Sequence, residues 1–236
     1  MRTPGSLYKF ALVLILGAAT ALVGCATGVD ADPLDPLEDY NRSMYQFNDA
    51  LDRAVIKPLA RGYQAITPAP VNKGITNFFN NLSDVRSAVN NLLQFKIGRA
   101  FSDVGRVAIN STVGILGLLD VANNMNLPRY DEDFGQTLGV WGMGPGPYIV
   151  LPFFGPSSGR DGVGVVVDWF TDPVMLIDDN AIRWGLRGLD VVDTRADLLN
   201  ASRVLEQAAL DPYAFVRDAY IQRRRDLVYD GNPPEE

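Results

Sequence analysis

The chain has 236 residues, of which 47% are hydrophobic, and its 28 acidic and 21 basic side chains give a formal net charge of −7. This acidic balance excludes a nucleic-acid binder, because affinity for phosphate backbones rests on clusters of Lys and Arg. With no histidine and a single cysteine, the chain lacks the commonest general base and the usual zinc and iron–sulfur ligands, so we expect no cofactor, no metal site and no enzyme activity.

The first 24 residues have the pattern of a secretory signal peptide. Arg2 and Lys9 are the only charges before Asp30, and an apolar run from residue 10 to residue 23 follows them. Such a run is typical of a signal peptide and is too short for a transmembrane helix, which needs roughly 20 apolar residues. Removal of residues 1–24 takes away two basic and no acidic side chains, which leaves 28 acidic against 19 basic, formally −9.

Cys25 is the expected site of lipid attachment. Leu22-Val23-Gly24-Cys25 resembles the lipobox of bacterial lipoproteins, where the thiol receives a diacylglyceryl group and becomes the new N-terminus. More than one acyl chain makes membrane anchoring stable. The alternative is a free cysteine beside an ordinary signal cleavage site. Ala26-Thr27 lacks the aspartate that often retains such proteins in the inner membrane, which indicates the outer membrane, facing the periplasm. Residues 25–34 are expected to form a tether.

A series of amphipathic helices is expected after the tether. Asp35-Pro36-Leu37-Glu38 has the cap, proline and glutamate of a helix start, and apolar residues continue at helical spacing to Leu51. The sequence predicts further helices from Lys57 to Thr67, from about Val71 to Leu82, from a cap at Ser83 to Leu93, and from Ile97 to Ala108.

The middle of the chain has a different composition. The apolar run from Val113 to Ala122 is too short to span a bilayer, but it could lie in one leaflet or pack as a helical hairpin. Glycines, prolines and aromatic residues between residues 134 and 157 predict an ordered loop region with an extended apolar stretch.

Helices are expected again in the last third, and together with the first set they form one helical domain over residues 35–228. A disordered tail is expected over residues 229–236. The predicted helices run from 160 to 170, from Pro173, from 181 to 192, from Thr194 to about 205, and from Asp211-Pro212 to about 227.

Two features could suggest an enzyme. The string Gly155-Pro156-Ser157-Ser158-Gly159 matches the G-x-S-x-G pattern of serine hydrolases, but a Ser–His–acid triad cannot form without histidine, and the glycines and prolines suit a turn. The acidic pairs Asp131/Asp133 and Asp178/Asp179 leave open a carboxylate-based hydrolase acting on lipid or peptidoglycan. A solvated acidic loop explains these pairs equally well.

Short strings along nearly the whole mature chain resemble the MlaA/VacJ family of lipoproteins. Each string is weak alone, but their number and order make the resemblance specific. One departure is Phe95-Lys96, where the family usually has a glycine, and it puts a local turn in doubt. The matching strings occupy residues 35–48, 57–60, 77–82, 91–94, 110–114, 120–122, 134–139, 146–148 with 151–152, 155–157 with 160–161, and 211–213.

The resemblance implies an outer-membrane lipoprotein that removes misplaced phospholipids from the outer leaflet and passes them to a soluble periplasmic carrier, which maintains lipid asymmetry. It implies an all-α fold, a ring of bent amphipathic helices lying in the inner leaflet around a polar channel, with a mobile hairpin near Asn110–Gly135. The implied partners are phospholipids, the outer-membrane bilayer, the carrier and trimeric porins. The alternative is a structural envelope lipoprotein or porin-associated scaffold that moves no lipid.

Three groups of residues are candidates for a role in this function. Polar residues off the first apolar stripe are expected to be channel-adjacent or structural, with a solvated face as the alternative: Asn41, Arg42 and Asn48. Glycines of the hairpin region are candidate hinges, or plain turn residues: Gly114, Gly117, Gly135 and Gly139. The tryptophans are expected either at a lipid interface or in a core: Trp141, Trp169 and Trp184.

Overall fold

The computed structural model describes residues 35–235, so the predicted signal peptide, Cys25 and most of the tether lie outside the described residues. The fold is almost entirely helical, as the sequence predicts. Its elements in chain order are α2 (Glu38–Leu51), η1 (Asp52–Ile56), α3 (Lys57–Ile66), α4 (Ala69–Leu93), α5 (Ile97–Thr112), α6 (Val121–Asn124), α7 (Phe134–Val140), β1 (Tyr148–Leu151), β2 (Gly155–Ser158), α8 (Gly159–Thr171), η2 (Pro173–Leu176), α9 (Asn180–Asp197), α10 (Leu199–Ala208) and α11 (Pro212–Val228).

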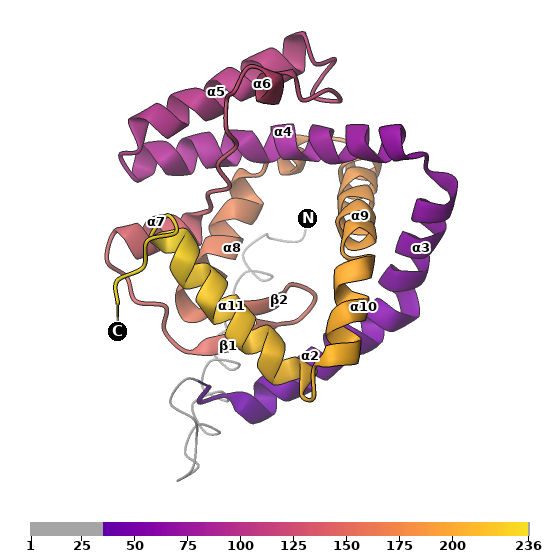
Figure 1. The fold of residues 1–236 in the computed structure, drawn as a ribbon, viewed down its shortest axis with the longest axis vertical. Coiled ribbons are helices and arrows are strands. Elements are labelled where there is room, and N and C mark those ends of the chain that lie inside the picture. The colour runs from indigo at the N-terminus through magenta and orange to yellow at the C-terminus, as the bar shows by residue number, and fades with distance from the viewer. Residues whose placement is uncertain (1–34, 236) are drawn as a thin grey trace, which may run out of the picture.

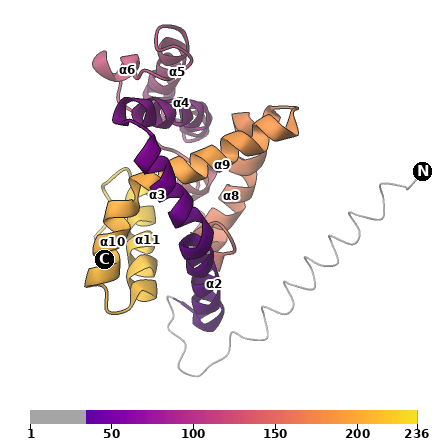
Figure 2. The same cartoon turned by 90° about the vertical axis from the view of Figure 1, so that its right-hand side faces the viewer.

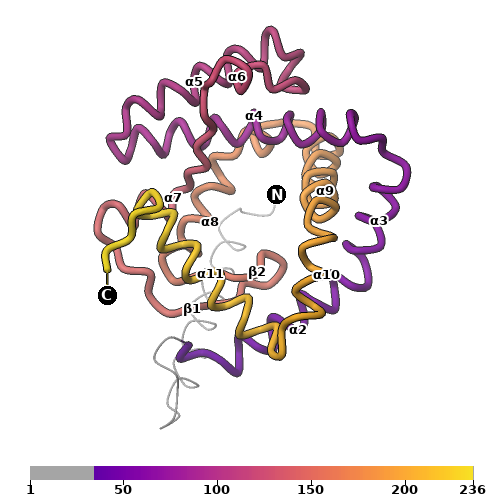
Figure 3. The backbone as a smooth tube through the Cα atoms, viewed as in Figure 1, coloured from indigo at the N-terminus to yellow at the C-terminus, as the bar shows by residue number. Residues whose placement is uncertain are grey.

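The helices follow one another around a ring instead of forming a parallel bundle (Figure 1). In Figure 3 the path from α2 through α3 to α4 runs along the bottom, the right and the top of the ring. α9 and α10 return along the inside of α3, and α11 crosses the lower left toward α7. In the perpendicular view, α10 and α11 lie on one side of α2 and α3, and α8 and α9 lie on the other (Figure 2). α4 packs on α5, α3 on α9, and α7 on α8.

The chain stays helical from α2 to α3, although the sequence predicts that a new helix begins at Lys57-Pro58. α2 leads through the π-helical turn η1 directly into α3, and the Lys57 N–H donates to the Asp52 carbonyl five residues back. A proline cannot donate to the helical ladder, and its ring crowds the preceding turn. The wider π-helical turn ahead of Pro58 accommodates both effects, so the chain bends without breaking.

The helix cap predicted at Asp35 is wrong. α2 begins at Glu38, and its cap residue Leu37 makes no side-chain capping bond. The Asp35 carboxylate is buried and instead accepts hydrogen bonds from Asn41 (2.7 Å) and Tyr213. A tertiary contact therefore takes the carboxylate that the sequence assigned to a local cap.

Two predicted helix boundaries do not exist. Ser83 lies inside α4, a single helix from Ala69 to Leu93, and Thr194 lies inside α9, which continues to Asp197. Both helices pack along their length against neighbours, α4 on α5 and α9 on α3, and this packing outweighs the weak capping tendency of a single Ser or Thr.

The region after residue 112 corrects two more expectations. Residues 113–120 form a series of turns instead of a helical hairpin, with Ile115 and Leu116 both at positive φ. The segment expected as the start of an ordered loop forms α7, because the Asp133 carboxylate caps its N-terminus by accepting from the Gln136 N–H. The extended apolar stretch is confirmed as β1, which pairs with β2 from Tyr148↔Ser158 to Leu151↔Gly155.

The G-x-S-x-G string occupies β2 and the first residue of α8. The Ser158 hydroxyl caps α8 by accepting from the Asp161 N–H at 3.1 Å, and the Ser157 side chain is 2% exposed. Both serines therefore have structural positions, as the glycines and prolines of the string indicate.

Two further details follow from the sequence. Phe95, which stands where the family usually has a glycine, adopts φ +60° while its side chain is exposed, so the turn that glycine favours is kept by a strained residue.

The predicted disordered tail begins too early. Asp230 pairs with Lys96 (2.6 Å), just before α5, and with Arg99 (2.5 Å) in α5.

Burial in this fold is inverted relative to a water-soluble protein. Among residues 35–235, 19 polar or charged residues are buried against 12 hydrophobic ones, and 35 large hydrophobic residues are exposed. Interiors of soluble domains are dominated by apolar side chains. Within the same residues, no helix combines the length and the apolar character needed to cross a membrane.

Candidate functional site

A cavity of about 420 Å³, lined by both charged and apolar side chains, lies where the ring elements meet. Its wall comes from α4, the residues ahead of α7, the β-hairpin, α8, α9 and α11. We call it the central cavity. Its charged lining residues are Arg86, Asp133, Asp161, Asp168, Asp172, Arg187 and Arg224, and its apolar and aromatic lining includes Phe154, Val165, Trp169 and Val191.

Cations and carboxylates line this cavity together, and some of their hydrogen-bonding capacity is unused. Arg187 pairs with Asp172 (2.5 Å) and Asp190 (3.3 Å), while Arg86 reaches Asp131 at 3.5 Å. The Nε atoms of Arg86 and Arg187 are both buried with no hydrogen-bond partner. A buried donor without an acceptor is costly, so neither guanidinium group is fully satisfied by the protein itself.

Arg224 closes one wall by holding two carboxylates. Its guanidinium lies 2.5 Å from Asp133 and 2.9 Å from Asp161, and the Tyr220 hydroxyl donates to Asp161 at 2.7 Å. Burial disfavours ionisation of Asp161, but the hydrogen bond from Arg160 and the charge of Arg224 outweigh it and lower the pKa of Asp161 to about 2. This wall stays ionised at neutral pH.

Asp168 differs from the other acids of the cavity. Its carboxylate accepts from the Phe134 N–H at 3.1 Å. Burial raises the pKa of Asp168 to about 6, against the opposing effects of that hydrogen bond and of the Arg86 charge. The central cavity therefore presents a carboxyl group that changes charge close to neutral pH beside permanently charged arginines.

An aromatic cluster stands at the edge of the cavity. Trp169 packs edge-on against Phe154 with ring centroids 5.8 Å apart and lies 6.1 Å from the ring of Trp184. The Arg187 guanidinium lies over the Trp169 ring at 5.4 Å. Trp184 and Trp141 are more than half exposed. Exposed tryptophans with a polar nitrogen and an apolar ring suit a boundary between water and hydrocarbon.

Helix α5, which packs on α4 and does not line the central cavity, turns its polar face toward α4 and its apolar face outward. On α5 the buried residues are Ala100, Asp103, Arg106 and Asn110. The apolar stripe of the same helix, which the sequence identified, lies on the opposite face, and Phe101 is 71% exposed. Such a face buries its apolar area only if something other than this chain covers it.

The polar candidates on α2 lie away from the central cavity. Asn41 is fully buried, donates to the Tyr148 carbonyl at 3.0 Å and accepts from the Val150 N–H at 2.7 Å. Asn48, two turns later, likewise accepts from the Phe153 N–H at 2.8 Å. Arg42 pairs with Glu38 and Asp211 and lies over the Tyr213 ring. These three side chains join α2 to β1, the turn after it and the start of α11, and a role beside the channel stays a prediction.

At each of the four candidate glycines, neighbouring atoms lie so close that an added Cβ would clash with them. A Cβ on Gly117, which has φ +90°, would lie 2.8 Å from Asn81, and a Cβ on Gly135 would lie 2.7 Å from the Asp161 carboxylate. Gly114 and Gly139 are equally tight, against the Leu119 carbonyl and the Arg160 guanidinium. Close packing requires a glycine at each of these positions, and a hinge role for them stays a prediction.

The acidic pairs are divided among structural roles. Asp133 caps α7 and binds Arg224, whereas its pair-mate Asp131 is exposed beside Arg86. Asp179 caps α9 by accepting from the Ala181 and Ile182 N–H groups. Within the part of the chain that the structure describes, no group of three or more potential ligands is placed to hold a metal ion.

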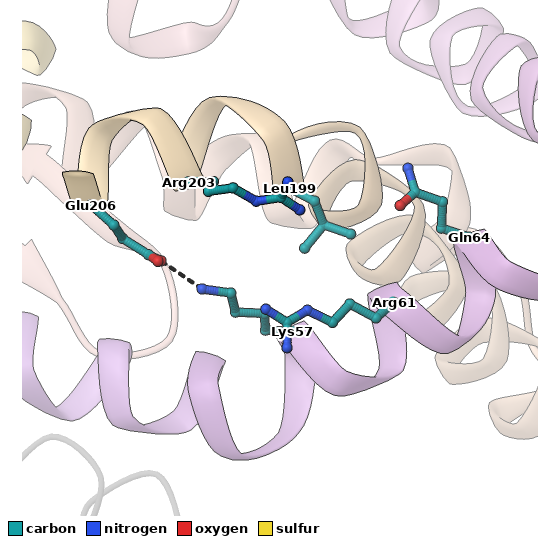
Figure 4. A pocket seen from close by; sticks show the side chains of 6 residues that line it. All are labelled: Lys57, Arg61, Gln64, Leu199, Arg203 and Glu206. Carbon is teal, nitrogen blue, oxygen red and sulfur yellow. Dashed lines mark hydrogen bonds and ion pairs between the residues drawn. The ribbon is translucent and has the colours of Figure 1, made fainter. Parts of the chain in front are cut away.

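A second, smaller polar feature lies between α3 and α10. Figure 4 shows the Arg61 and Arg203 side chains extending into this groove, which Leu199 floors and in which Lys57 bonds to Glu206 at 2.6 Å. Its volume is about 70 Å³, which is too small for more than a single ionic group.

Comparison with known proteins gives a consistent result. Residues 33–227 match the model of the family described as MlaA lipoprotein. The intermembrane phospholipid transport system lipoprotein MlaA of Escherichia coli (strain K12) is 37% identical over 94% of this chain and 90% of its own length. The protein of the same description from Haemophilus influenzae is 35% identical over 93% of this chain and 91% of its own.

A solved structure shares the fold. It comes from work on the structural basis for maintenance of bacterial outer membrane lipid asymmetry, and it superimposes with a TM-score of 0.72 at 35% identity. The alignment covers 82% of this chain and 98% of that one.

Proposed function

The chain belongs to the MlaA lipoprotein family, and from that premise we propose that it removes misplaced phospholipids from the outer leaflet of the outer membrane and passes them to a periplasmic carrier. This is the outer-membrane step of intermembrane phospholipid transport, and it maintains lipid asymmetry. The central cavity is the proposed passage for the lipid headgroup. No bond is made or broken in such transfer, so the reaction needs no catalytic residue.

The observation that carries this proposal is the inverted burial. Apolar faces such as that of α5, with Phe101 exposed, suit acyl chains outside the ring. The polar interior suits a headgroup. A charged headgroup crosses hydrocarbon slowly because desolvating its charge is costly. A ring that is apolar outside and polar inside lowers this cost while the acyl chains stay in an apolar environment.

The lining of the central cavity supports a zwitterionic or anionic headgroup. The guanidinium groups of Arg86 and Arg187, which line the cavity, can donate hydrogen bonds to a passing phosphate, since guanidinium and phosphate form charge-assisted hydrogen bonds. Asp168 and Asp172 line the cavity together with these arginines, which prevents a phosphate from binding too tightly to leave. Net direction then comes either from tighter lipid binding later in the pathway or from ATP spent elsewhere in the system.

The location follows from the same proposal. The chain is anchored in the outer membrane by lipid on Cys25, faces the periplasm and lies in the inner leaflet. The soluble carrier would receive lipid at the periplasmic side. Trimeric porins are proposed as neighbours that fix the ring in the bilayer, since residues on its outer faces are apolar enough to pack against lipid or protein alike.

A plug of the central cavity tests the proposal. Val191 lines the cavity and is 50% exposed, so Val191→Trp should fill space without disturbing a core. Val204→Trp on α10, 65% exposed and outside the cavity, is the matched control. Each variant is expressed in a strain that lacks the chromosomal gene, and surface-exposed phospholipid is measured. Val191→Trp should leave as much surface-exposed phospholipid as the deletion does. Val204→Trp, present at the same protein level, should restore lipid asymmetry.

The alternative of a structural scaffold predicts a different outcome. If both variants restore asymmetry equally, or if the deletion leaves surface phospholipid unchanged while envelope attachments fail, lipid passage through the cavity is wrong and the scaffold is supported. Radiolabelled phospholipid recovered from the purified chain should be chemically intact, and cleavage products would favour the hydrolase instead.

A further inference from the structure

A second cavity of about 440 Å³ lies on the other side of the Arg224 wall. The loop between α7 and β1, strand β1 and helix α11 enclose it, and we call it the outer cavity. Its volume falls within the range of about 300–1,000 Å³ that is usual for small-molecule sites. Asp161, Tyr220 and Arg224 line both cavities, so this group forms a partition one side chain thick between them.

The outer cavity has the lining of an amphiphile site. Met143, Pro145 and Val228 supply an apolar side, and Arg160 and Arg225 join Arg224 on a basic side where Asp161 is the one acid. An apolar half beside a net positive half matches a molecule with a hydrocarbon part and a phosphate. A purely apolar ligand would leave the arginines desolvated.

One buried polar group in this lining has no partner. Tyr148 lines the outer cavity and is 3% exposed, and its hydroxyl makes no hydrogen bond. Buried tyrosine hydroxyls usually find a partner. Burial, with the charge of Asp35, raises the pKa of Tyr148, so the hydroxyl stays protonated and keeps a donor that no acceptor takes up.

The loop at the mouth of the cavity has a backbone that requires glycine. Gly142 and Gly146 have φ +94° and φ +68°. A Cβ at either position would have room, so the positive φ, and not close packing, requires glycine there. The loop is held in place from inside, because the Arg160 N–H donates to the Pro145 carbonyl at 3.0 Å. The cavity is therefore built by a defined turn and held by hydrogen bonds.

We propose that the outer cavity is a second phospholipid site, which takes the phosphate-bearing headgroup of one lipid beside the central cavity and is separated from it by the Asp161–Tyr220–Arg224 partition. The inference rests on the proposed transport function and adds a waiting position to it. A lipid passes from one cavity to the other only when the Arg224 side chain leaves Asp133 and Asp161. The partition then limits the exchange to one headgroup at a time.

Photolabelling tests the second site. The full-length lipoprotein is reconstituted in vesicles of phosphatidylethanolamine and phosphatidylglycerol that contain a phospholipid with a diazirine in its headgroup, and labelled peptides are mapped by mass spectrometry. The expected result is label on two separate segments, residues 142–148 of the outer cavity and residues 163–172 of the central cavity. Label on the central segment alone would overturn the second site and leave the transport proposal intact. Label on neither segment would overturn both.

Two variants separate the outer cavity from its surroundings. Met143→Trp should fill the outer cavity and remove label from residues 142–148 while keeping label on residues 163–172. Phe153→Trp, at an exposed position of the β-hairpin that does not line the outer cavity, should change neither. If Met143→Trp leaves the outer label unchanged, the label reports surface adsorption and the proposal is wrong.

The unpaired hydroxyl gives a finer test. Tyr148→Phe should weaken labelling of the outer segment about threefold to tenfold, the effect of one lost hydrogen bond. Tyr45→Phe, in the same aromatic cluster but not lining the cavity, should have no effect. Excess inorganic phosphate should not displace the label, and displacement by phosphate alone would show an ion site in place of a lipid site.

Discussion

The pair α4–α5 and the junction of α2, β1 and α11 use amphipathic helices in opposite ways. α4 and α5 meet through polar residues such as Asp84, Asn91 and Arg106, and their apolar faces point away from the protein. At the junction, Tyr148, Val150 and Tyr213 form an apolar cluster that is at most 3% exposed. The junction is packed as in a soluble protein, whereas α4–α5 buries polar side chains and leaves its apolar side exposed, as the proposed contact with lipid requires.

The difference shows where each region obtains its stability. In α4–α5 it comes from buried ion pairs and hydrogen bonds, which need complete partners. At the junction it comes from aromatic packing together with one buried amide that binds a strand edge. Substitutions that remove one polar partner should therefore be most damaging in α4–α5.

The largest effect is expected at Arg106. Its guanidinium is 2% exposed and lies 2.9 Å from Asp84 and 3.1 Å from Asp120. Arg106→Met should lower the free energy of unfolding by about 3–5 kcal/mol, because a buried carboxylate loses its main partner. Arg99→Met, which breaks an exposed pair with Asp230, should cost less than about 1 kcal/mol. Chemical denaturation in detergent micelles measures the free energy of unfolding of both variants. Equal losses would mean that the buried polar contacts between α4 and α5 do not stabilise the two helices.

A smaller effect is expected at the junction. Asn41→Ala removes hydrogen bonds to both the Tyr148 carbonyl and the Val150 N–H, and it should cost about 2–3 kcal/mol because these groups stay buried. Asn48→Ala removes the equivalent bonds at the half-buried end of the strand and should cost about 1 kcal/mol. The same denaturation experiment applies, and a larger loss at Asn48 than at Asn41 would contradict the packing described for the junction.

The smallest effect depends on pH and belongs to Asp103 in the α4–α5 seam. Burial raises the pKa of Asp103 to about 6, despite the hydrogen bond from Asn91. The Oδ1 atom of Asp103 is buried without a partner, so burial disfavours its charge and favours the protonated form. The folded state therefore binds this proton more tightly than the unfolded chain, whose aspartates titrate near pH 3.9.

The sign of the pH dependence follows from this. The stabilisation is complete below about pH 4 and is lost as pH rises through about 6, so the free energy of unfolding should fall by roughly 2 kcal/mol between these values. Asp103→Asn copies the protonated form and should remove most of this slope. A slope unchanged in Asp103→Asn would assign the pH dependence to another group.

The sequence predicted where the helices lie better than it predicted whether their apolar faces point into the protein or away from it. The spacing of Ile97, Phe101 and Val104 correctly predicted α5, but periodicity indicates only that an apolar face exists and not whether protein or lipid covers it. The resemblance to a membrane-embedded family supplied the direction. Helix boundaries at Ser83 and Thr194 were wrong because capping tendencies are local, whereas the packing that overrides them is tertiary.

The candidate site was harder to predict than the fold. Arg86, Asp168, Arg187 and Arg224 come from four helices and meet only when the ring closes, and none of them stands in a recognisable motif. Asn41 and Asn48 were noticed because they are polar residues in a family-like string. Their role in binding the β1 backbone could not be predicted, since the strand lies more than 100 residues away.

The central claim is that the outward face of the ring contacts acyl chains while its interior contacts water. Cys25 is the chain's one native cysteine, and the expected lipid blocks its thiol, so a spin label can be placed at a single new cysteine in Phe101→Cys on α5 or in Val191→Cys in the central cavity. In reconstituted bilayers, collisions with apolar oxygen should dominate for the label at position 101, and collisions with a water-soluble nickel chelate should dominate at position 191. If both labels are reached by the chelate and neither by membrane oxygen, the ring lies in water and the transport account is wrong.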